Sequence, residues 1–219
     1  MRKITLITIT AILIILLFSI IYLSIFGLKT DNFNNFINSK VKEYNSKLTL
    51  KLEDVFIKLN LSQGSITINT KNSILIAEDN IVKISNIDIN LNIIKFIRNE
   101  KSIKNIKIES FENSIKNTTS FLSSIDYDLS SYIFYSDIKK GLIKFNLDAE
   151  FNINNQNINS YFVSGFVKNA KFSLIDGGNI HDMYFNFEAK NKKVRISNLN
   201  FKYKNLNLLS KSIEIIKEK

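Results

Sequence analysis

The sequence has 219 residues, a formal net charge of +10, no cysteine, no proline and a single histidine. These counts exclude disulfides, thiolate metal sites, thiol nucleophiles and multi-histidine metal sites. The positive charge is compatible with nucleic acid or an anionic membrane. However, no block of about five or more like charges occurs, and Asn, Ser, Asp and Glu interrupt the lysines. We therefore interpret the charge as a solvated face and expect no nucleic-acid partner.

The segment Ile4–Leu28 contains no charged residue and consists mostly of Ile, Leu and Phe. About 20 apolar residues in a helix cross a hydrocarbon core of roughly 30 Å, so we predict a membrane-spanning helix. Its Thr and Ser hydroxyls are expected to bond back to the helix backbone. A cleaved signal peptide is the alternative, but its apolar core is only about 7–15 residues long and ends at an A-x-A-type site. The longer run here favours a retained anchor.

The flanking charges predict the orientation of this anchor. Arg2 and Lys3 precede the apolar run, and only Lys29 follows it immediately. By the positive-inside rule, the N-terminus is expected in the cytoplasm and the bulk of the chain on the other side of the membrane. Residues 1–30 are then the cytoplasmic start and the transmembrane anchor of a single-pass protein.

Residues 31–48 follow the anchor with apolar residues at helical spacing, among them Phe33, Ile37, Val41 and Leu48. Steps of three and four place these residues on one stripe of a helix. We predict an amphipathic helix that covers the start of a sheet, because apolar alternation begins where the helix ends.

Residues 49–219 alternate between apolar and polar with a period of two, which predicts short, half-buried antiparallel strands. The alternation changes phase at Glu53-Asp54, which indicates a bulge or a tight turn. A short helix is expected at Ile93–Arg98, and a helical insertion near residues 114–140. The predicted fold is mainly β: a transmembrane helix followed by a curled antiparallel sheet, a groove or half-barrel, with a few short helices.

The last apolar residues, Ile213, Ile215 and Ile216, are not followed by a polar strand that would close the sheet. An open strand edge invites pairing with another strand. We therefore expect either further β-groove chain or a partner protein at this edge.

The sequence contains no G-x-S-x-G, Walker A or G-x-G-x-x-G motif. His181 next to Asp182 follows Gly177-Gly178 and is expected in a solvated hairpin. Asp126 and Asp128 offer two carboxylates, whereas a hard cation takes about six oxygen ligands. We therefore expect no catalytic residues, no metal and no cofactor.

The apolar strand faces leave two arrangements open. A sandwich would bury two such faces against each other, whereas a trough would leave one face open to acyl chains. Alternation is the same in both, so the periodicity does not choose between them.

The order of elements resembles the start of bacterial AsmA-like proteins, the family that includes TamB. An N-terminal anchor, a short amphipathic helix and strands over Leu48–Ile68 lead into the stretches 87–91, 93–98 and 103–109. The stretches 164–170 and 196–201 are similar to the repetitive strands of that family. The resemblance implies an N-terminal part of a repeating β-groove protein, anchored in the inner membrane and located in the periplasm. Such proteins shield phospholipid tails on the way to the outer membrane.

We therefore predict a membrane-anchored envelope protein that binds phospholipid acyl chains and contributes to lipid transport or outer-membrane biogenesis. The alternative is a non-catalytic, membrane-tethered scaffold that binds an envelope assembly partner. The residues expected to line the lipid groove are the apolar-phase positions Ile66, Ile68, Ile87, Ile89, Leu91, Ile106, Ile108, Phe145, Leu147, Phe151, Phe172, Phe185, Phe187 and Phe201.

Overall fold

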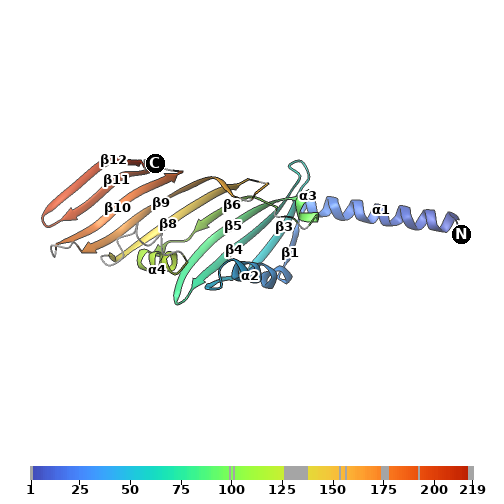
Figure 1. Cartoon of the computed structure of the whole chain (residues 1–219), viewed down its shortest axis with the longest axis horizontal. Coiled ribbons are helices and arrows are strands. Elements are labelled where there is room, and N and C mark those ends of the chain that lie inside the picture. Colours follow the sequence, from blue (N-terminus) through green and yellow to red (C-terminus); the bar gives the residue numbers. More distant parts are fainter. Residues whose placement is uncertain are drawn as a thin grey trace.

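The computed structural model describes residues 2–98, 100, 102–125, 138–152, 154–155, 157–173, 178–191 and 193–216. The twelve strands of this part of the chain form one antiparallel sheet in the order β1-β3-β4-β5-β6-β8-β9-β10-β11-β12, with β2 paired to β4 and β7 to β8 (Figure 1). The predicted mainly β class is thereby confirmed. The expected curl is absent from this sheet, which is uncurled. Curling would bring β1 and β12 together over the apolar face, which helices occupy instead.

The helices are α1 (Arg2–Ile25), α2 (Asn32–Tyr44), α3 (Ile93–Ile97) and α4 (Ile115–Ile125). The first strands are β1 (Leu28–Thr30), β2 (Leu48–Lys51), β3 (Asp54–Asn60), β4 (Ser65–Ala77), β5 (Asn80–Asn92) and β6 (Ile103–Ser110). The later strands are β7 (Asn113–Ser114), β8 (Ile138–Phe151), β9 (Ile158–Ser173), β10 (Asn179–Lys190), β11 (Lys193–Tyr203) and β12 (Leu206–Ile216). Of the helical insertion expected near 114–140, α4 is described, and residues 126–137 lie outside the described part.

Helix α1 extends away from the sheet along the long axis of the molecule (Figure 1). Among the described residues it is the one helix long and apolar enough to cross a membrane, and its membrane-span segment Lys3–Ile25 has no buried residue. The hydroxyls of Thr8, Thr10 and Ser19 donate to the carbonyl oxygens four residues earlier, each at 2.9 Å. These three hydroxyls therefore form their hydrogen bonds within the helix, as predicted, which is consistent with a single-pass anchor.

The anchor is joined to the sheet through Gly27. Directly after α1, β1 pairs with β3, with Leu28 opposite Ile57 and Thr30 opposite Val55. Gly27 is buried at this junction and has a φ of +72°, and an added Cβ would lie 2.4 Å from Cζ of Phe56. Because only glycine accepts both the backbone angle and the close contact, β1 can follow α1 without an intervening loop.

The phase change at Glu53-Asp54 is neither a tight turn nor a bulge with an inserted residue: the strand is interrupted at Leu52 and Glu53 and continues as β3. Strands β2 and β3 follow one another along β4 in a single register, with Leu50 opposite Leu75 and Ile57 opposite Ile68. Strand β4 changes phase at the same level, at Asn72, which has a φ of +53°. The apolar side chains of neighbouring strands therefore change phase together and stay on one face.

A second line of irregularities crosses β9, β10 and β11 at Asn169, Asp182 and Asn198, each with a φ of +53°. Asn and Asp accept this left-handed conformation more readily than other residues with a Cβ. The pairing between β9 and β10 changes register beside Asp182, and Val167 and Ala170 lie in the same buried cluster. The apolar face therefore continues across this line as well.

Helices α2 and α4 lie on the apolar face and form a partial second layer (Figure 1). One buried cluster joins Leu50, Ala77, Val82, Ile84 and Ile87 to Phe121 of α4, with Ile37 and Val41 of α2 packed against it. A second cluster joins Ile115 of α4 to Val167 and Ala170. Helix α4 therefore contacts both clusters and connects the two halves of the sheet.

We predict that Gly27→Ala destabilises the junction between anchor and sheet by about 2–4 kcal/mol, because it adds a backbone penalty to a steric clash. The matched control is Gly64→Ala, where φ is +54° but no atom lies within 4 Å of an added Cβ. This control is expected to cost about 1 kcal/mol. Thermal unfolding of the detergent-solubilised protein measures both. Equal losses would show that the contact with Phe56 does not hold β1 in place.

Candidate functional site

The apolar face of the sheet carries the residues expected to line a groove. Residues directly opposite each other in antiparallel strands share a face, and so do residues two apart in one strand. The pairs Ile68–Ile89, Ile89–Ile106, Ile87–Ile108 and Ile108–Leu147 continue this face across β4, β5, β6 and β8. The same rule places on one face all fourteen expected positions: Ile66, Ile68, Ile87, Ile89, Leu91, Ile106, Ile108, Phe145, Leu147, Phe151, Phe172, Phe185, Phe187 and Phe201.

A cavity of about 340 Å³ lies on this face between α4 and the sheet. Nine of its ten lining residues are apolar, and the tenth is Thr118, whose hydroxyl donates to the carbonyl of Ser114 at 2.9 Å. The cavity therefore presents no unpaired polar side chain. Its lining residues are Leu75, Val82, Thr118, Phe121, Leu122, Ile143, Phe145, Leu147, Val163 and Phe187.

Gly165 lies beneath the ring of Phe187, which lines the cavity. It lies opposite Phe145 on β8 and opposite Phe187 on β10. A Cβ at Gly165 would lie 2.1 Å from the carbonyl oxygen of Lys144 and 2.8 Å from Cζ of Phe187. Both pairings are regular at this point, so Gly165 marks a close approach of its neighbours rather than a bulge.

Helix α4 is positioned over the cavity from its N-terminal side. Asn113 of β7 accepts a hydrogen bond from the backbone N–H of Lys83 at 2.7 Å and donates to the Lys83 carbonyl at 2.9 Å. This pair of bonds places the start of α4 beside β5. Ile115 and Phe121 then point to the sheet and are 5% and 6% exposed.

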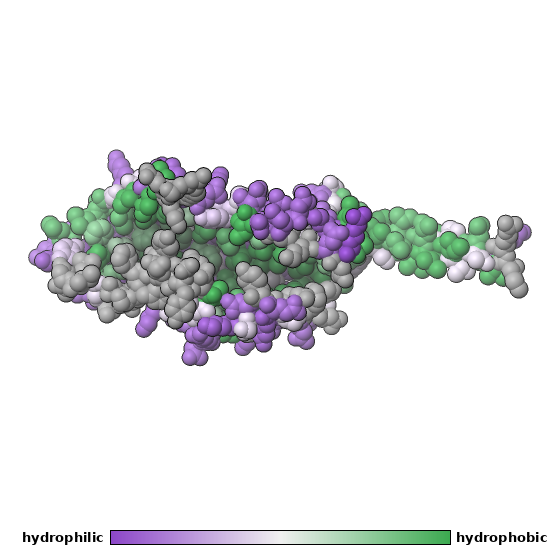
Figure 2. All heavy atoms as spheres, viewed as in Figure 1, coloured by the Kyte–Doolittle hydropathy of each residue, from purple (hydrophilic) through white to green (hydrophobic). Residues whose placement is uncertain are grey.

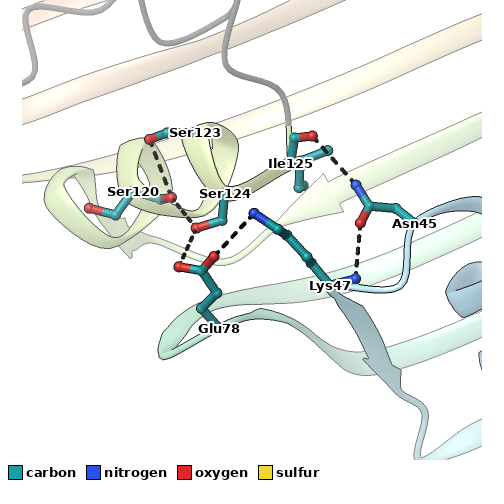
Figure 3. Close-up of polar contacts among 7 residues, drawn as sticks. All are labelled: Asn45, Lys47, Glu78, Ser120, Ser123, Ser124 and Ile125. Atoms are coloured by element: carbon teal, nitrogen blue, oxygen red, sulfur yellow. Dashed lines mark hydrogen bonds and ion pairs between the residues drawn. The ribbon is translucent and has the colours of Figure 1, made fainter.

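The C-terminal end of α4 is held by polar contacts to α2 and to the β4–β5 turn (Figure 3). Asn45 donates to the Ile125 carbonyl at 3.4 Å, and Ser124 donates to Glu78 at 3.3 Å. Glu78 also forms an ion pair with Lys47 at 3.4 Å. Both side chains of this ion pair are more than half exposed, and an exposed ion pair contributes only about 0–1 kcal/mol. Apolar packing rather than this polar contact therefore supplies most of the stability of α4.

The opposite face of the sheet is polar. Asn69 donates to Asn86 at 2.7 Å and to Asp88 at 2.6 Å, and Asn90 donates to Asn105 at 2.7 Å. Farther along, Lys107 pairs with Asp148 at 3.1 Å, and Lys144 with Glu109 at 2.8 Å. Because this face carries hydrogen-bonded amides and ion pairs, an apolar ligand would find its site on the other face.

Three of the fourteen predicted residues line the cavity: Phe145, Leu147 and Phe187. The others lie elsewhere on the apolar face, in the two buried clusters or beyond them. Sequence reasoning missed four strand residues that line the cavity, Leu75, Val82, Ile143 and Val163. It also did not place Thr118, Phe121 and Leu122 over the sheet. The i, i+3, i+4 spacing of those three residues indicates one helix face, but it does not say which strands that face covers.

The only pair suited to proton transfer that the sequence suggested is His181 with Asp182. His181 lies in β10, the second strand of the β9–β10 hairpin, and is half-buried rather than solvated. Asp182 accepts a hydrogen bond from Lys202 at 3.1 Å, which holds the pKa of its carboxyl below the ordinary value. Asp126 and Asp128 lie outside the described residues. Within the described part of the chain, no three His, Asp or Glu residues are grouped to hold a metal ion.

Comparisons with protein-family models, with curated proteins and with solved structures found no match.

We predict that Phe121→Ala lowers the free energy of unfolding by about 3–5 kcal/mol, since it removes a buried ring that contacts both the sheet and the cavity. Phe111→Ala is the matched control, because Phe111 is 42% exposed and its loss is expected to cost less than about 1 kcal/mol. Denaturant unfolding in detergent compares the two variants. A similar loss in both would mean that α4 is not packed on the sheet.

Proposed function

We propose that the protein binds phospholipid acyl chains on the apolar face of its sheet and shields them from water. Its role is then in lipid transport between the inner and outer membranes, or in outer-membrane biogenesis, without catalysis. The observation that carries the proposal is the apolar cavity beneath α4.

The size and lining of the cavity suit part of an acyl chain. Small-molecule pockets commonly begin at about 300 Å³, and this cavity has about 340 Å³. Each methylene group that leaves water for an apolar site contributes about 0.8 kcal/mol. Because the lining offers no free hydrogen-bonding group, it favours hydrocarbon over polar ligands.

The position of the anchor supports the same function. The apolar face begins at β1, which follows α1 directly, and extends across the sheet to β12. In Figure 2, hydrophobic residues occupy the middle of the sheet, with hydrophilic residues along its borders. An acyl chain leaving the bilayer beside α1 would therefore meet apolar surface from the first strands onward.

The proposed location is the inner membrane, with the N-terminus in the cytoplasm and the sheet in the periplasm. Arg2 and Lys3 before the span favour this orientation, and the resemblance of the sequence to AsmA-like proteins supports the compartment.

A second candidate function is a membrane-tethered scaffold that binds an envelope protein through β12. Among the described residues, β12 pairs with β11 alone and exposes large apolar side chains. An exposed apolar edge strand is a template for adding another strand. The most exposed of these side chains are Leu206, Leu209 and Ile216, at 62%, 72% and 64%.

A photocrosslinking amino acid in the full-length protein distinguishes the two functions in living cells. We predict that p-benzoylphenylalanine in place of Phe187 gives an adduct with the mass of a phospholipid, because Phe187 lines the cavity. The same residue in place of Leu209 reports on the edge. Mass spectrometry that found protein adducts at Leu209 and no lipid adduct at Phe187 would reject lipid binding in favour of the scaffold.

We further predict that Val163→Trp reduces the lipid adduct at Phe187 several-fold, because the indole fills the cavity. Phe162→Trp is the matched control: the neighbouring position is on the polar face, and it introduces the same side chain. Circular dichroism establishes that both variants fold. If folded Val163→Trp protein kept its lipid adduct, the cavity would not be the binding site.

A further inference from the structure

A small apolar surface projects from the sheet outside both buried clusters. We call it the α3 foot and define it by Leu61, Ile94, Phe96 and Ile97, which are 54%, 59%, 45% and 76% exposed. Leu61 belongs to the turn between β3 and β4, and the other three belong to α3. Four large apolar side chains exposed together are costly in water and indicate a surface that is covered in the working protein.

Backbone and side-chain bonds hold the α3 foot in one shape. The side chain of Asn92 accepts from the backbone N–H of Lys95 at 3.1 Å, which caps the start of α3. The N–H of Ile93 donates to the Gly64 carbonyl at 3.1 Å and ties α3 to the β3–β4 turn. Lys104 of β6 donates to the Gln63 carbonyl at 3.1 Å. These hydrogen bonds therefore fix the backbone segments that carry the four exposed apolar side chains.

The α3 foot lies at the end of the sheet where α1 leaves it. Strand β1 starts with Leu28 opposite Ile57, so the C-terminal end of α1 is near the end of β3 that leads to the Leu61 turn. Asn60 is opposite Ser65, and Ser65 is opposite Asn92, the residue before α3. Figure 1 accordingly draws α3 and the sheet-proximal end of α1 at the same end of the sheet.

The charges around the α3 foot are mostly positive. Lys95 lies in α3, Arg98 ends it, and Lys104 reaches the β3–β4 turn through its bond to Gln63. Glu100 is the one acidic residue among the described residues 93–104. Basic side chains next to a membrane span attract anionic headgroups, and apolar side chains beside them enter the boundary between headgroups and acyl chains.

We propose that the α3 foot rests in the headgroup region of the same bilayer that α1 crosses, and that its occupant is the anionic phospholipid surface. With α1, it gives the protein two attachments to the membrane at the mouth of the apolar face. The sheet is thereby held at a set angle to the bilayer. This inference requires α1 to span the bilayer but does not depend on lipid in the cavity beneath α4.

The test uses fluorescence of the full-length protein in phospholipid vesicles. The natural chain has no cysteine, so Ile97→Cys introduces a single site for an environment-sensitive dye such as NBD. Phospholipids that carry a nitroxide quench this dye only where it touches lipid, which separates membrane contact from burial in protein. The nitroxide is placed near the headgroup for the Ile97 label and deep in the acyl chain for the Leu13 label, which lies in the middle of the span. Leu13→Cys in α1 and Leu209→Cys in β12 supply the membrane and water references.

The expected result is a blue-shifted emission and strong headgroup-nitroxide quenching for the Ile97 label, with neither for the Leu209 label. Lys95→Glu with Arg98→Glu should reduce the quenching in vesicles containing phosphatidylglycerol and have little effect in pure phosphatidylcholine.

An Ile97 label that behaves like the Leu209 label while the Leu13 label is quenched by lipid would overturn the proposal. An unquenched Leu13 label would overturn it too, because the α3 foot requires α1 in the bilayer. Lipid crosslinking at Phe187 reports on the cavity separately.

Discussion

The structure depends on keeping the apolar side chains of neighbouring strands in phase. In a sheet with side chains alternating every residue, a slip of one position in one strand would turn its apolar set toward water. This chain changes phase within its strands, yet β2–β3, β4 and β5 make the change at one level, near Asp54, Asn72 and Ser85. Farther along, β9, β10 and β11 change phase in the same way at Asn169, Asp182 and Asn198, which have positive φ angles. One continuous apolar face results, and every later feature is built on it.

A large apolar face has to be covered, and the chain covers it unevenly. Helix α2 packs over the first strands, and α4 packs over the middle, where Ile115 and Phe121 bury themselves in separate clusters. Between these two anchoring residues the helix does not fill the space above the sheet, which leaves the cavity lined by Phe145, Leu147 and Phe187. A helix resting on two clusters thus explains both the stability of the layer and the apolar space within it.

The attachment to the membrane follows from the same sheet. Because Gly27 allows β1 to pair with β3 directly after α1, the membrane span and the first strand form one continuous unit. The apolar face therefore starts beside the apolar helix α1, at the end of the sheet that also carries the exposed side chains of α3. In the proposed function this geometry matters more than any single residue, since a hydrocarbon chain can move along apolar surface only where that surface has no polar gap.

The sequence by itself determined the local features of this protein. The uncharged run predicts α1, the period of two predicts the strands and their apolar faces, and the spacing of Ile37, Val41, Phe121 and Leu122 predicts helices. These signals depend on neighbours within a few residues of each other. The tertiary structure alone decided that the strand is interrupted at Leu52 and Glu53 without a change of register, that the sheet is uncurled, and that α4 lies over β4, β5, β8, β9 and β10. The alternation of apolar and polar residues predicts which residues of a strand share a face, but it does not predict which residues they pair with on the next strand. The cavity arises from contacts between segments far apart in the chain.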